Sequence, residues 1–328
     1  MYSLGIDVAK HKLDVCLLNP ENDQRRAKTV PNTPEGFTEL RDWLIRQTVP
    51  DLGQVHLILE ATGVYHEAVA LWFFNAGAAV SVVNPAQTKA FGQGLAVRTK
   101  TDARDSQVLA RYGALVNPPR WHPPAPEIRE LNALIARLDA VEADLRRERN
   151  RQEKAEAVAL PTTVAESLQQ HITFLEQEAT RLQTAIHDHV DQHPRLRQDR
   201  DLLQSIPAVG EKTAQRLLAV LHSRDFTGAD QVTAFLGLVP VECQSGSSLH
   251  RRPRLSKAGA PRIRAALYMA AVVATRHNPH IQALYQRLLA RGKAKMAALG
   301  AAMRKLVQLA FGVLKHQQPY QAHWTPAP

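Results

Sequence analysis

Residues 2–18 read YSLGIDVAKHKLDVCLL, and this stretch decides the fold of the amino-terminal region. Apolar side chains alternate with polar or small ones on both sides of residues 9–12, which predicts two paired strands joined by a tight turn. The alternating apolar positions are Leu4, Ile6, Val8, Leu13, Val15 and Leu17. Asp7 falls on the other face of the first strand, where a carboxylate beside an apolar core costs free energy. We therefore expect Asp7 to have a function.

The segments that follow alternate between helices and strands. In chain order we expect a helix from Thr33 to about Arg46, a strand over Val55–Glu60, a helix over 64–76 that Gly77 ends, a strand over 79–83 that Asn84-Pro85 stops, and a helix over 102–112. Such alternation predicts an α/β sheet domain, which we assign to residues 1–125.

Two apolar seams follow a proline-rich connection at residues 118–126. The first seam consists of Leu131, Leu134, Leu138, Val141 and Leu145, and the second of Leu168, Ile172, Leu175, Ala179, Leu182 and Ile186. Their heptad spacing predicts a coiled-coil region over residues 126–198, interrupted at Pro161. The two seams either form a dimerising stalk or pack against each other within one chain, and the sequence leaves both open.

The charge of the chain is unevenly distributed. Residues 243–328 hold 14 Lys or Arg and no Asp or Glu, whereas the first 242 residues hold 27 basic and 31 acidic residues. Basic surfaces bind polyanions by releasing condensed counterions, so we expect nucleic-acid binding by a mostly helical domain over residues 199–328. The alternative is a solvated basic face without a ligand.

The remaining composition narrows the class of protein. Cys16 and Cys243 are too few for a disulfide framework or a thiolate zinc cluster, which is typical of a reducing cytosol. We expect no signal peptide at the amino terminus and no membrane span, since no stretch approaches about 18 uncharged apolar residues. The expected location is the cytoplasm.

Four carboxylates are candidates for one metal site. Asp7 and Glu60 lie on separate strands, and Asp102 and Asp105 share one face of a helix because they are three residues apart. Crowded carboxylates repel, and hard divalent cations such as Mg²⁺ or Mn²⁺ relieve that repulsion. Two such ions about 3.5–4 Å apart stabilise the attacking and leaving oxygens of phosphoryl transfer. The alternative is that these acids are surface charges, with Asp102 capping its helix.

Several motifs in order resemble the DEDD transposases of bacterial insertion sequences, the one-ten family, which are relatives of the Piv DNA invertase. The motifs are Gly5-Ile6-Asp7-Val8-Ala9-Lys10, Glu60-Ala61-Thr62-Gly63-Val64-Tyr65, Asn84-Pro85 and Lys100-Thr101-Asp102-Ala103-Arg104-Asp105. The resemblance implies an RNase H-like domain similar to the RuvC junction resolvase. It also implies that Asp7, Glu60, Asp102 and Asp105 are the metal ligands.

A second set of motifs resembles the carboxy-terminal domain of the same family. It comprises Phe235-Leu236-Gly237-Leu238-Val239-Pro240, Gln244-Ser245-Gly246-Ser247-Ser248 and Ser256-Lys257-Ala258-Gly259. The resemblance implies that Ser245 is the nucleophile that becomes linked to DNA, with Ser247 and Ser248 as local competitors. The nucleic-acid-binding candidates beside it are Arg251, Arg252, Arg254, Lys257, Arg262 and Arg264.

The remaining motifs give weaker predictions of function. Leu203–Ala214 resembles a helix-hairpin-helix element, but Ala208 stands where such hairpins have their first glycine, while Gly210 is kept. We interpret His277-Asn278-Pro279-His280 as a loop because no cysteine or acid lies nearby. His56 and His66 are expected to be packing or solvent-exposed histidines.

We therefore expect an insertion-sequence transposase or site-specific recombinase that cuts and rejoins DNA through a phosphoserine intermediate. The resemblance implies donor and target DNA as substrates, a structured guide (bridge) RNA and a homo-oligomer, a dimer or tetramer, associated with the bacterial nucleoid. One alternative is a RuvC-like junction-resolving endonuclease in which water attacks. The others are a non-catalytic nucleic-acid-binding protein and a sugar-kinase-like ATPase, for which we find no Gly-rich phosphate loop of the right type.

Overall fold

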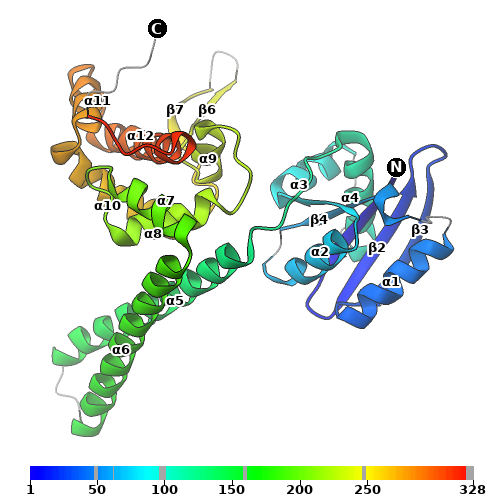
Figure 1. Ribbon diagram of the computed structural model, residues 1–328, viewed down its shortest axis with the longest axis horizontal. Helices are drawn as coiled ribbons and strands as arrows, with labels where there is room; N and C mark the ends of the chain where they lie inside the picture. The colour runs from blue at the N-terminus through cyan, green and yellow to red at the C-terminus, as the bar shows by residue number, and fades with distance from the viewer. Residues whose placement is uncertain (48–50, 62, 96–100, 158–160, 246–248, 323–328) are drawn as a thin grey trace. The chain divides into compact units, whose positions relative to one another are not determined.

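The computed structural model describes residues 1–47, 51–61, 63–95, 101–157, 161–245 and 249–322, with backbone alone at 156, 243–245 and 249–252. The chain divides into two compact units, Met1–Pro123 and Pro124–Pro328 (Figure 1). The first unit is α/β and the second is mostly helical, as predicted.

Among the described residues, five strands form the mixed sheet of the first unit. Their order is β3-β2-β1-β4-β5, with β1 antiparallel to β2 and parallel to β4. The strands are β1 (Tyr2–Val8), β2 (Lys12–Asn19), β3 (Gln24–Pro31), β4 (Val55–Glu60) and β5 (Ala79–Val83). Sequence analysis missed β3, because this edge strand exposes most of its polar side chains and lacks apolar alternation.

Helices cover both faces of this sheet. The helical segments are α1 (Pro34–Arg46), the short 3₁₀ turn η1 (Leu52–Gln54), α2 (Tyr65–Asn75), α3 (Pro85–Gly94) and α4 (Asp102–Val116). On one face, α1 and α2 pack on the alternating apolar residues of β1 and β2, including Leu4 and Ile6. Asn84, expected only to stop a strand, also begins α3, since its Oδ1 accepts a hydrogen bond from the Ala86 amide at 2.9 Å.

Helix α4 lies unusually close to the other face of the sheet. A Cβ at Gly5 of β1 would stand 2.0 Å from the Ser106 carbonyl oxygen, and a Cβ at Gly113 of α4 would stand 2.4 Å from Ile58 of β4. The Ser3 hydroxyl donates to the Ala110 carbonyl oxygen at 2.7 Å across this contact. Two glycines therefore let the backbone of α4 approach β1 and β4, which brings the first turn of α4 to the carboxyl ends of these strands.

The second unit begins with the helices α5 (Pro126–Glu156) and α6 (Thr162–Gln192), which form a hairpin. The two predicted seams contribute to one apolar cluster, which contains Leu131, Leu138, Val141, Leu175, Ala179, Leu182 and Ile186. The seams thus pack against each other within one chain, which is one of the two alternatives left open by the sequence. The first seam, which a dimerising stalk would leave free for a partner chain, packs against α6.

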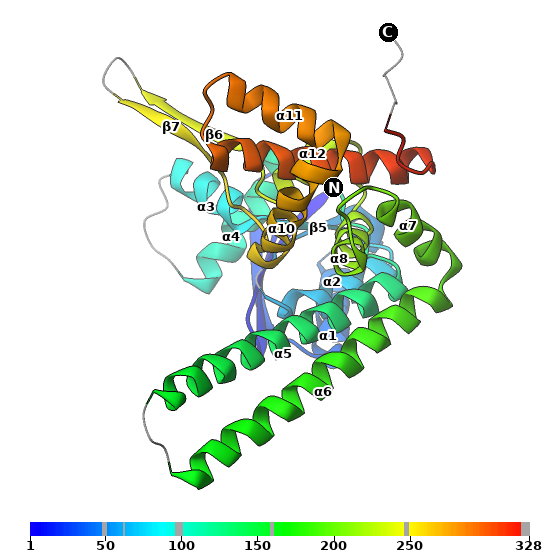
Figure 2. The same ribbon diagram turned by 90° about the vertical axis from the view of Figure 1, so that its left-hand side faces the viewer.

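The rest of the second unit is a helical cluster with one β-hairpin. Its elements are α7 (Pro194–Gln204), α8 (Glu211–Leu221), α9 (Ala229–Phe235), β6 (Pro240–Ser245), β7 (Leu249–Leu255), α10 (Pro261–His277), α11 (Pro279–Ala290) and α12 (Lys295–His316). Figure 2 shows β6 and β7 extending away from the helices, and sequence analysis did not predict these two strands. Among the described helices, α12 alone is long and apolar enough to span a membrane. It packs in the apolar core of the second unit through Leu306, Val307 and Ala310.

Candidate active site

The four predicted acids come from three neighbouring elements of the first unit. Asp7 is the second-last residue of β1 and Glu60 the last residue of β4, and these strands are parallel neighbours in which Ile6 pairs with Leu59. Asp102 and Asp105 lie in the first turn of α4, which packs on the same strands. The carboxyl ends of adjacent parallel strands therefore place these acids at one edge of the sheet.

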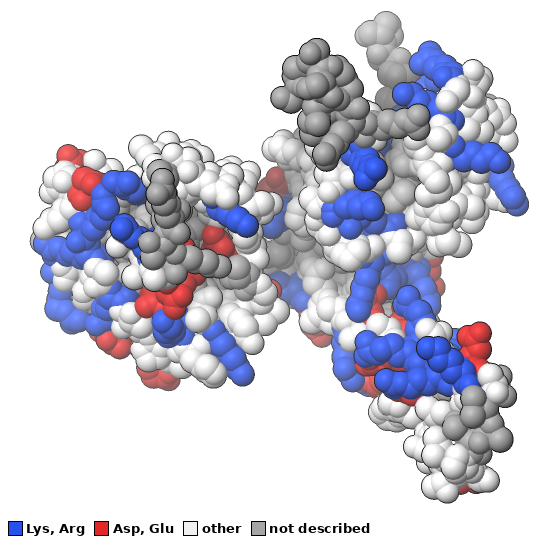
Figure 3. All heavy atoms as spheres, turned by 180° about the vertical axis from the view of Figure 1, so that it is seen from behind, with Lys and Arg blue, Asp and Glu red and all other residues white. Residues whose placement is uncertain are grey.

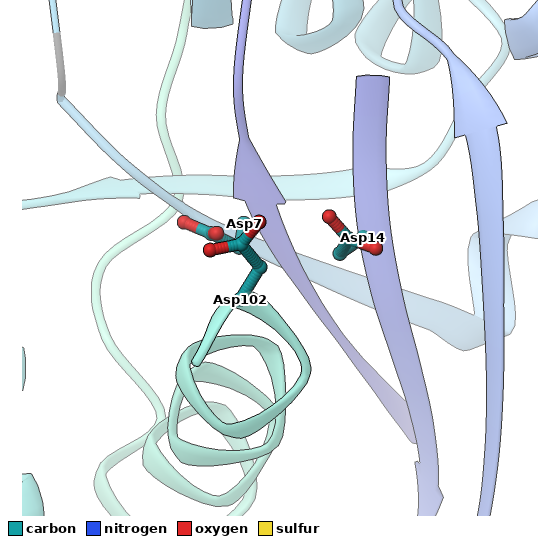
Figure 4. A group of neighbouring side chains, drawn as sticks. All are labelled: Asp7, Asp14 and Asp102. Atoms are coloured by element: carbon teal, nitrogen blue, oxygen red, sulfur yellow. The ribbon is translucent and has the colours of Figure 1, made fainter. Parts of the chain in front are cut away.

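A fifth acid, Asp14, belongs to the same cluster. It lies on β2 directly opposite Asp7, and one carboxylate oxygen from each of Asp7, Asp14 and Asp102 lies within 4.8 Å of the others. Figure 4 shows Asp102 reaching from α4 toward Asp7, with Asp14 on the neighbouring strand. Sequence analysis missed Asp14, although it alternates with Leu13 and Val15 just as Asp7 alternates with its own apolar neighbours.

The pKa of Asp7 is affected by the acids that surround it. Partial burial, followed by the negative charges of Asp102, Asp105, Glu60 and Asp14, raises the pKa of Asp7 from 3.8 to about 6. The negative charges of the other three predicted acids therefore reach Asp7. The Thr88 hydroxyl donates a hydrogen bond to Glu60 Oε1, which orients that carboxylate from α3.

The donor set fits a hard divalent cation. The clustered ligand atoms are carboxylate oxygens, which Mg²⁺ and Mn²⁺ prefer over the nitrogen and sulfur ligands typical of zinc. Burial first, and then the neighbouring carboxylates, disfavour the ionised form of Asp7 and raise its pKa, and a bound cation would offset that penalty. The alternative that Asp102 caps α4 is wrong, because the Thr101 hydroxyl accepts from the Arg104 amide at 3.3 Å and caps the helix instead.

The second candidate element, the β6–β7 hairpin, is anchored at its base by two glycines. Gly237 has φ +69°, and a Cβ there would stand 2.2 Å from the Ala258 carbonyl oxygen. Gly259 has φ +76°, and a Cβ there would stand 2.2 Å from the Phe235 carbonyl oxygen. The two motifs quoted around these glycines therefore cross in direct backbone contact, with the Lys257 amide donating to the Gly237 carbonyl oxygen at 3.1 Å.

Ser245 is the last residue of β6 and its backbone pairs with Leu249 of β7. The side chains of Ser245, Arg251 and Arg252, and the whole of Ser247 and Ser248, lie outside the described residues. The hairpin backbone therefore places Ser245 at the outer end of β6, away from the glycine-anchored base.

Two family models match the chain. A transposase model of the DEDD IS110 type covers residues 4–155, and a model described as the transposase IS116/IS110/IS902 family covers residues 200–286. Relatives include the pilin gene-inverting proteins of Moraxella lacunata and Moraxella bovis, each 34% identical over 97% of this chain and 97% of their own length. The chain belongs to the IS110 transposase family. A protein of insertion element IS110 from Streptomyces coelicolor is 26% identical over 48% of this chain and 38% of its own length.

Membership of the IS110 family confirms the resemblance drawn from the motifs. It makes the chain a DNA-processing enzyme of the transposase and DNA-invertase class, with DNA as its substrate. The family is one whose acid motif is associated with divalent metals, in agreement with the carboxylate cluster of the first unit. The sugar-kinase-like alternative has no support in these matches.

The basic candidates of this IS110-family chain have different surroundings. Arg254 and Lys257 are exposed. Arg262 lies 3.4 Å from Asp139 of α5, so part of its charge is neutralised within the chain. Arg264 donates from Nη1 to the carbonyl oxygens of Ala258 (2.7 Å) and Gly259 (2.9 Å), which ties it to the hairpin base. Figure 3 shows Lys and Arg side chains spread over the helical part of the second unit beyond the α5–α6 hairpin.

The remaining motifs have structural roles among the described residues. Ala208 has φ +80° between α7 and α8, so the turn keeps the left-handed backbone that a glycine would adopt more easily. Asn278 caps α11 by accepting from the Ile281 amide at 3.2 Å, and His280 hydrogen-bonds Tyr320. His56 is a packing histidine, as expected, because it is buried against Ser81 at 2.7 Å.

Proposed function

We propose that this IS110-family chain cuts and rejoins DNA strands as an insertion-sequence transposase or site-specific recombinase. The observation that carries the proposal is the cluster of Asp7, Asp14 and Asp102 carboxylates, with Glu60 at the end of the strand beside β1 and Asp105 in the first turn of the helix that carries Asp102. The family membership and the acid-free stretch 243–328 support the choice of DNA as the substrate. The Moraxella relatives are named for inverting a pilin gene, a reaction that also requires cutting and rejoining of strands.

The first unit, on this proposal, is an RNase H-like domain of the RuvC type. Its strand order β3-β2-β1-β4-β5, with three antiparallel strands followed by two parallel ones, supports this assignment. The α5–α6 hairpin is proposed to be the coiled-coil region over 126–198, with the helical transposase domain after it. The packing of the two heptad seams against each other supports the coiled-coil assignment.

The proposed metal ligands are Asp7, Glu60, Asp102 and Asp105, with Mg²⁺ or Mn²⁺ as the ion. When bound, such an ion stabilises the negative charge that develops on the oxygens of a phosphodiester under attack. The chain's own contribution is to hold the carboxylates in place. Thr88 orients Glu60, and the close approach of α4 at Gly5 positions Asp102 and Asp105 beside Asp7.

The proposed nucleophile is Ser245. Its Oγ forms a bond to phosphorus, the bond from phosphorus to the deoxyribose oxygen breaks, and the departing oxygen gains a proton as the serine loses one. The phosphoserine bond conserves the energy of the cleaved phosphodiester, so attack by a deoxyribose hydroxyl on this bond rejoins the strand and frees the serine. The two units must meet on DNA for this step, either within one protomer or between two.

The partners follow from the same proposal. Arg251, Arg252, Arg254, Lys257, Arg262 and Arg264 are proposed to contact phosphates of donor and target DNA or of a structured guide RNA. Several cuts held in one assembly require a homo-oligomer. Because the two seams pack against each other within one chain, a different surface must form the contact between protomers. The proposed location is the bacterial cytoplasm, on the nucleoid.

The test compares strand cleavage with DNA binding in Asp102→Asn. The variant should lose strand cleavage and keep wild-type affinity for DNA, because it removes a metal ligand and no phosphate contact. Asp42→Asn is the matched control, since it neutralises another acid of the same unit that is paired with Arg41. Wild-type cleavage by Asp102→Asn would overturn the proposed acid site.

A further inference from the structure

A lysine side chain occupies the acid site. Lys12, the first residue of β2, places its Nζ 2.8 Å from Asp14 Oδ2 and 2.7 Å from Asp102 Oδ2. Asp14 is held in turn by the Thr29 hydroxyl, which donates to its Oδ1 at 2.6 Å. The ammonium therefore connects β2 to the first turn of α4 at the point where the carboxylates converge.

Lys12 can leave this position without disturbing the fold. Its side chain is 47% exposed and that of Asp102 is 55% exposed, so the contact lies at the mouth of the site. An ion pair this exposed contributes little to stability, because water and salt screen both charges. The long, flexible lysine stem also allows the ammonium to move into solvent while the backbone of β2 stays in place.

We propose that Lys12 is the resident counter-cation of the acid site: it holds Asp14 and Asp102 together in the metal-free protein and is displaced when a divalent cation binds. This inference rests on the metal site of the proposed function. The oxygens of Asp7, Asp14 and Asp102 lie within 4.8 Å of one another, so a cation among them would meet the ammonium at close range. Two positive centres at this distance repel, and the divalent ion satisfies more carboxylates than the single charge of lysine.

Lys12 is thus a positioning residue for the metal. Its ammonium relieves part of the repulsion among the carboxylates before an ion arrives, and it keeps Asp102 against β2. Lys12 and the metal ion therefore compete for the same carboxylates. The wild-type chain must break the ion pairs of Lys12 when it binds the metal, whereas a chain without the ammonium does not have to.

The competition can be measured with Mn²⁺ alone. The free Mn²⁺ signal in electron paramagnetic resonance is titrated with the full chain as wild type, Lys12→Met, Lys12→Arg and a control. Lys12→Met should bind Mn²⁺ on the order of tenfold more tightly, because one positive charge is removed a few ångströms from the ion. Lys12→Arg keeps the charge and should stay close to wild type. The control is Lys28→Met, which removes a lysine paired with Glu39 at 2.7 Å on the face that α1 covers.

Thermal unfolding in EDTA shows that each variant is folded, and Lys12→Gln replaces Lys12→Met if the latter is not. Equal or weaker Mn²⁺ binding by the lysine-free variant overturns the proposal and leaves the metal site of the proposed function intact. Failure of all four chains to bind Mn²⁺ overturns the metal site itself and the inference with it. Loss of binding in Asp7→Asn verifies that the titration reports this site.

Discussion

Replacing Gly5 by alanine should damage both the stability of the first unit and its acid site. The added Cβ would stand 2.0 Å from the Ser106 carbonyl oxygen and 2.3 Å from the Ala110 amide nitrogen. Both atoms belong to the backbone of α4, so no side-chain rotation relieves the clash. The helix must therefore move away from β1, and Gly5 lies only two residues before Asp7 on the same face of this strand.

The size of the effect follows from these distances. Real Cβ atoms essentially never approach another atom within 3.0 Å. The helix must therefore retreat by about 1 Å where it crosses Gly5, and forced overpacking of this kind costs about 1–3 kcal/mol. The same retreat carries Asp102 and Asp105 away from Asp7. A misplacement of about 1 Å in a catalytic group lowers a rate by about 100-fold, so strand cleavage should fall by about that factor.

The assay is urea denaturation of Gly5→Ala in EDTA, with a Mn²⁺ titration and a strand-cleavage rate on the same preparation. The matched control is Gly94→Ala, because a Cβ at Gly94 meets nothing within 4 Å and should leave stability and metal affinity unchanged. If Gly5→Ala keeps the stability and Mn²⁺ affinity of the wild type, α4 does not rest on β1 as described. The geometric account of the acid site would then be refuted.

Two further predictions concern charge. Because the pKa of Asp7 is about 6 in the folded protein and 3.8 for an unperturbed aspartate, the metal-free chain should lose stability as pH rises from about 4 to about 6. At pH 7 in EDTA, Asp7→Asn should therefore be more stable than wild type by about 2 kcal/mol, a figure that is reduced for solvent screening. Urea denaturation at several pH values measures this difference in the free energy of unfolding, which should shrink toward pH 4. A difference that does not change with pH would contradict this prediction. Replacing Arg251, Arg252 and Arg254 by alanine should flatten the log–log salt dependence of DNA binding by about 0.9 for each phosphate that is no longer neutralised, and an unchanged slope would remove them from the interface.

The closeness of Asp7 and Asp102 was predictable in part because some of its signals are local. Alternation on β1 places Asp7 on the face opposite Leu4 and Ile6, and the three-residue spacing of Asp102 and Asp105 aligns them on a helix, whereas the position of Glu60 beside Asp7 follows from the β1–β4 register. Asp14 was missed although it lies directly opposite Asp7, because the register that pairs them emerges only when the turn between β1 and β2 is built.

Contacts between distant segments were not predictable from the sequence. Lys12 reaches Asp102 across 90 positions, and no periodic pattern relates the two. In the sequence, Gly5 looks like any small residue of an alternating strand, and the need for a glycine there becomes clear only from the packing of α4 on β1. The β6–β7 hairpin was missed because its polar, basic strands lack apolar alternation, and heptad spacing alone did not distinguish a dimerising stalk from the hairpin observed.

The covalent protein–DNA adduct tests the central claim most directly. Wild type, Ser245→Ala, Ser247→Ala and Asp102→Asn are incubated with a cleavable DNA and Mg²⁺, denatured, and digested so that mass spectrometry identifies any peptide carrying a nucleotide. We predict an adduct on Ser245 in the wild type and in Ser247→Ala, and none in Ser245→Ala or Asp102→Asn. Cleavage at the wild-type rate by Ser245→Ala, without an adduct, would show that water attacks and that the chain is a junction-resolving hydrolase.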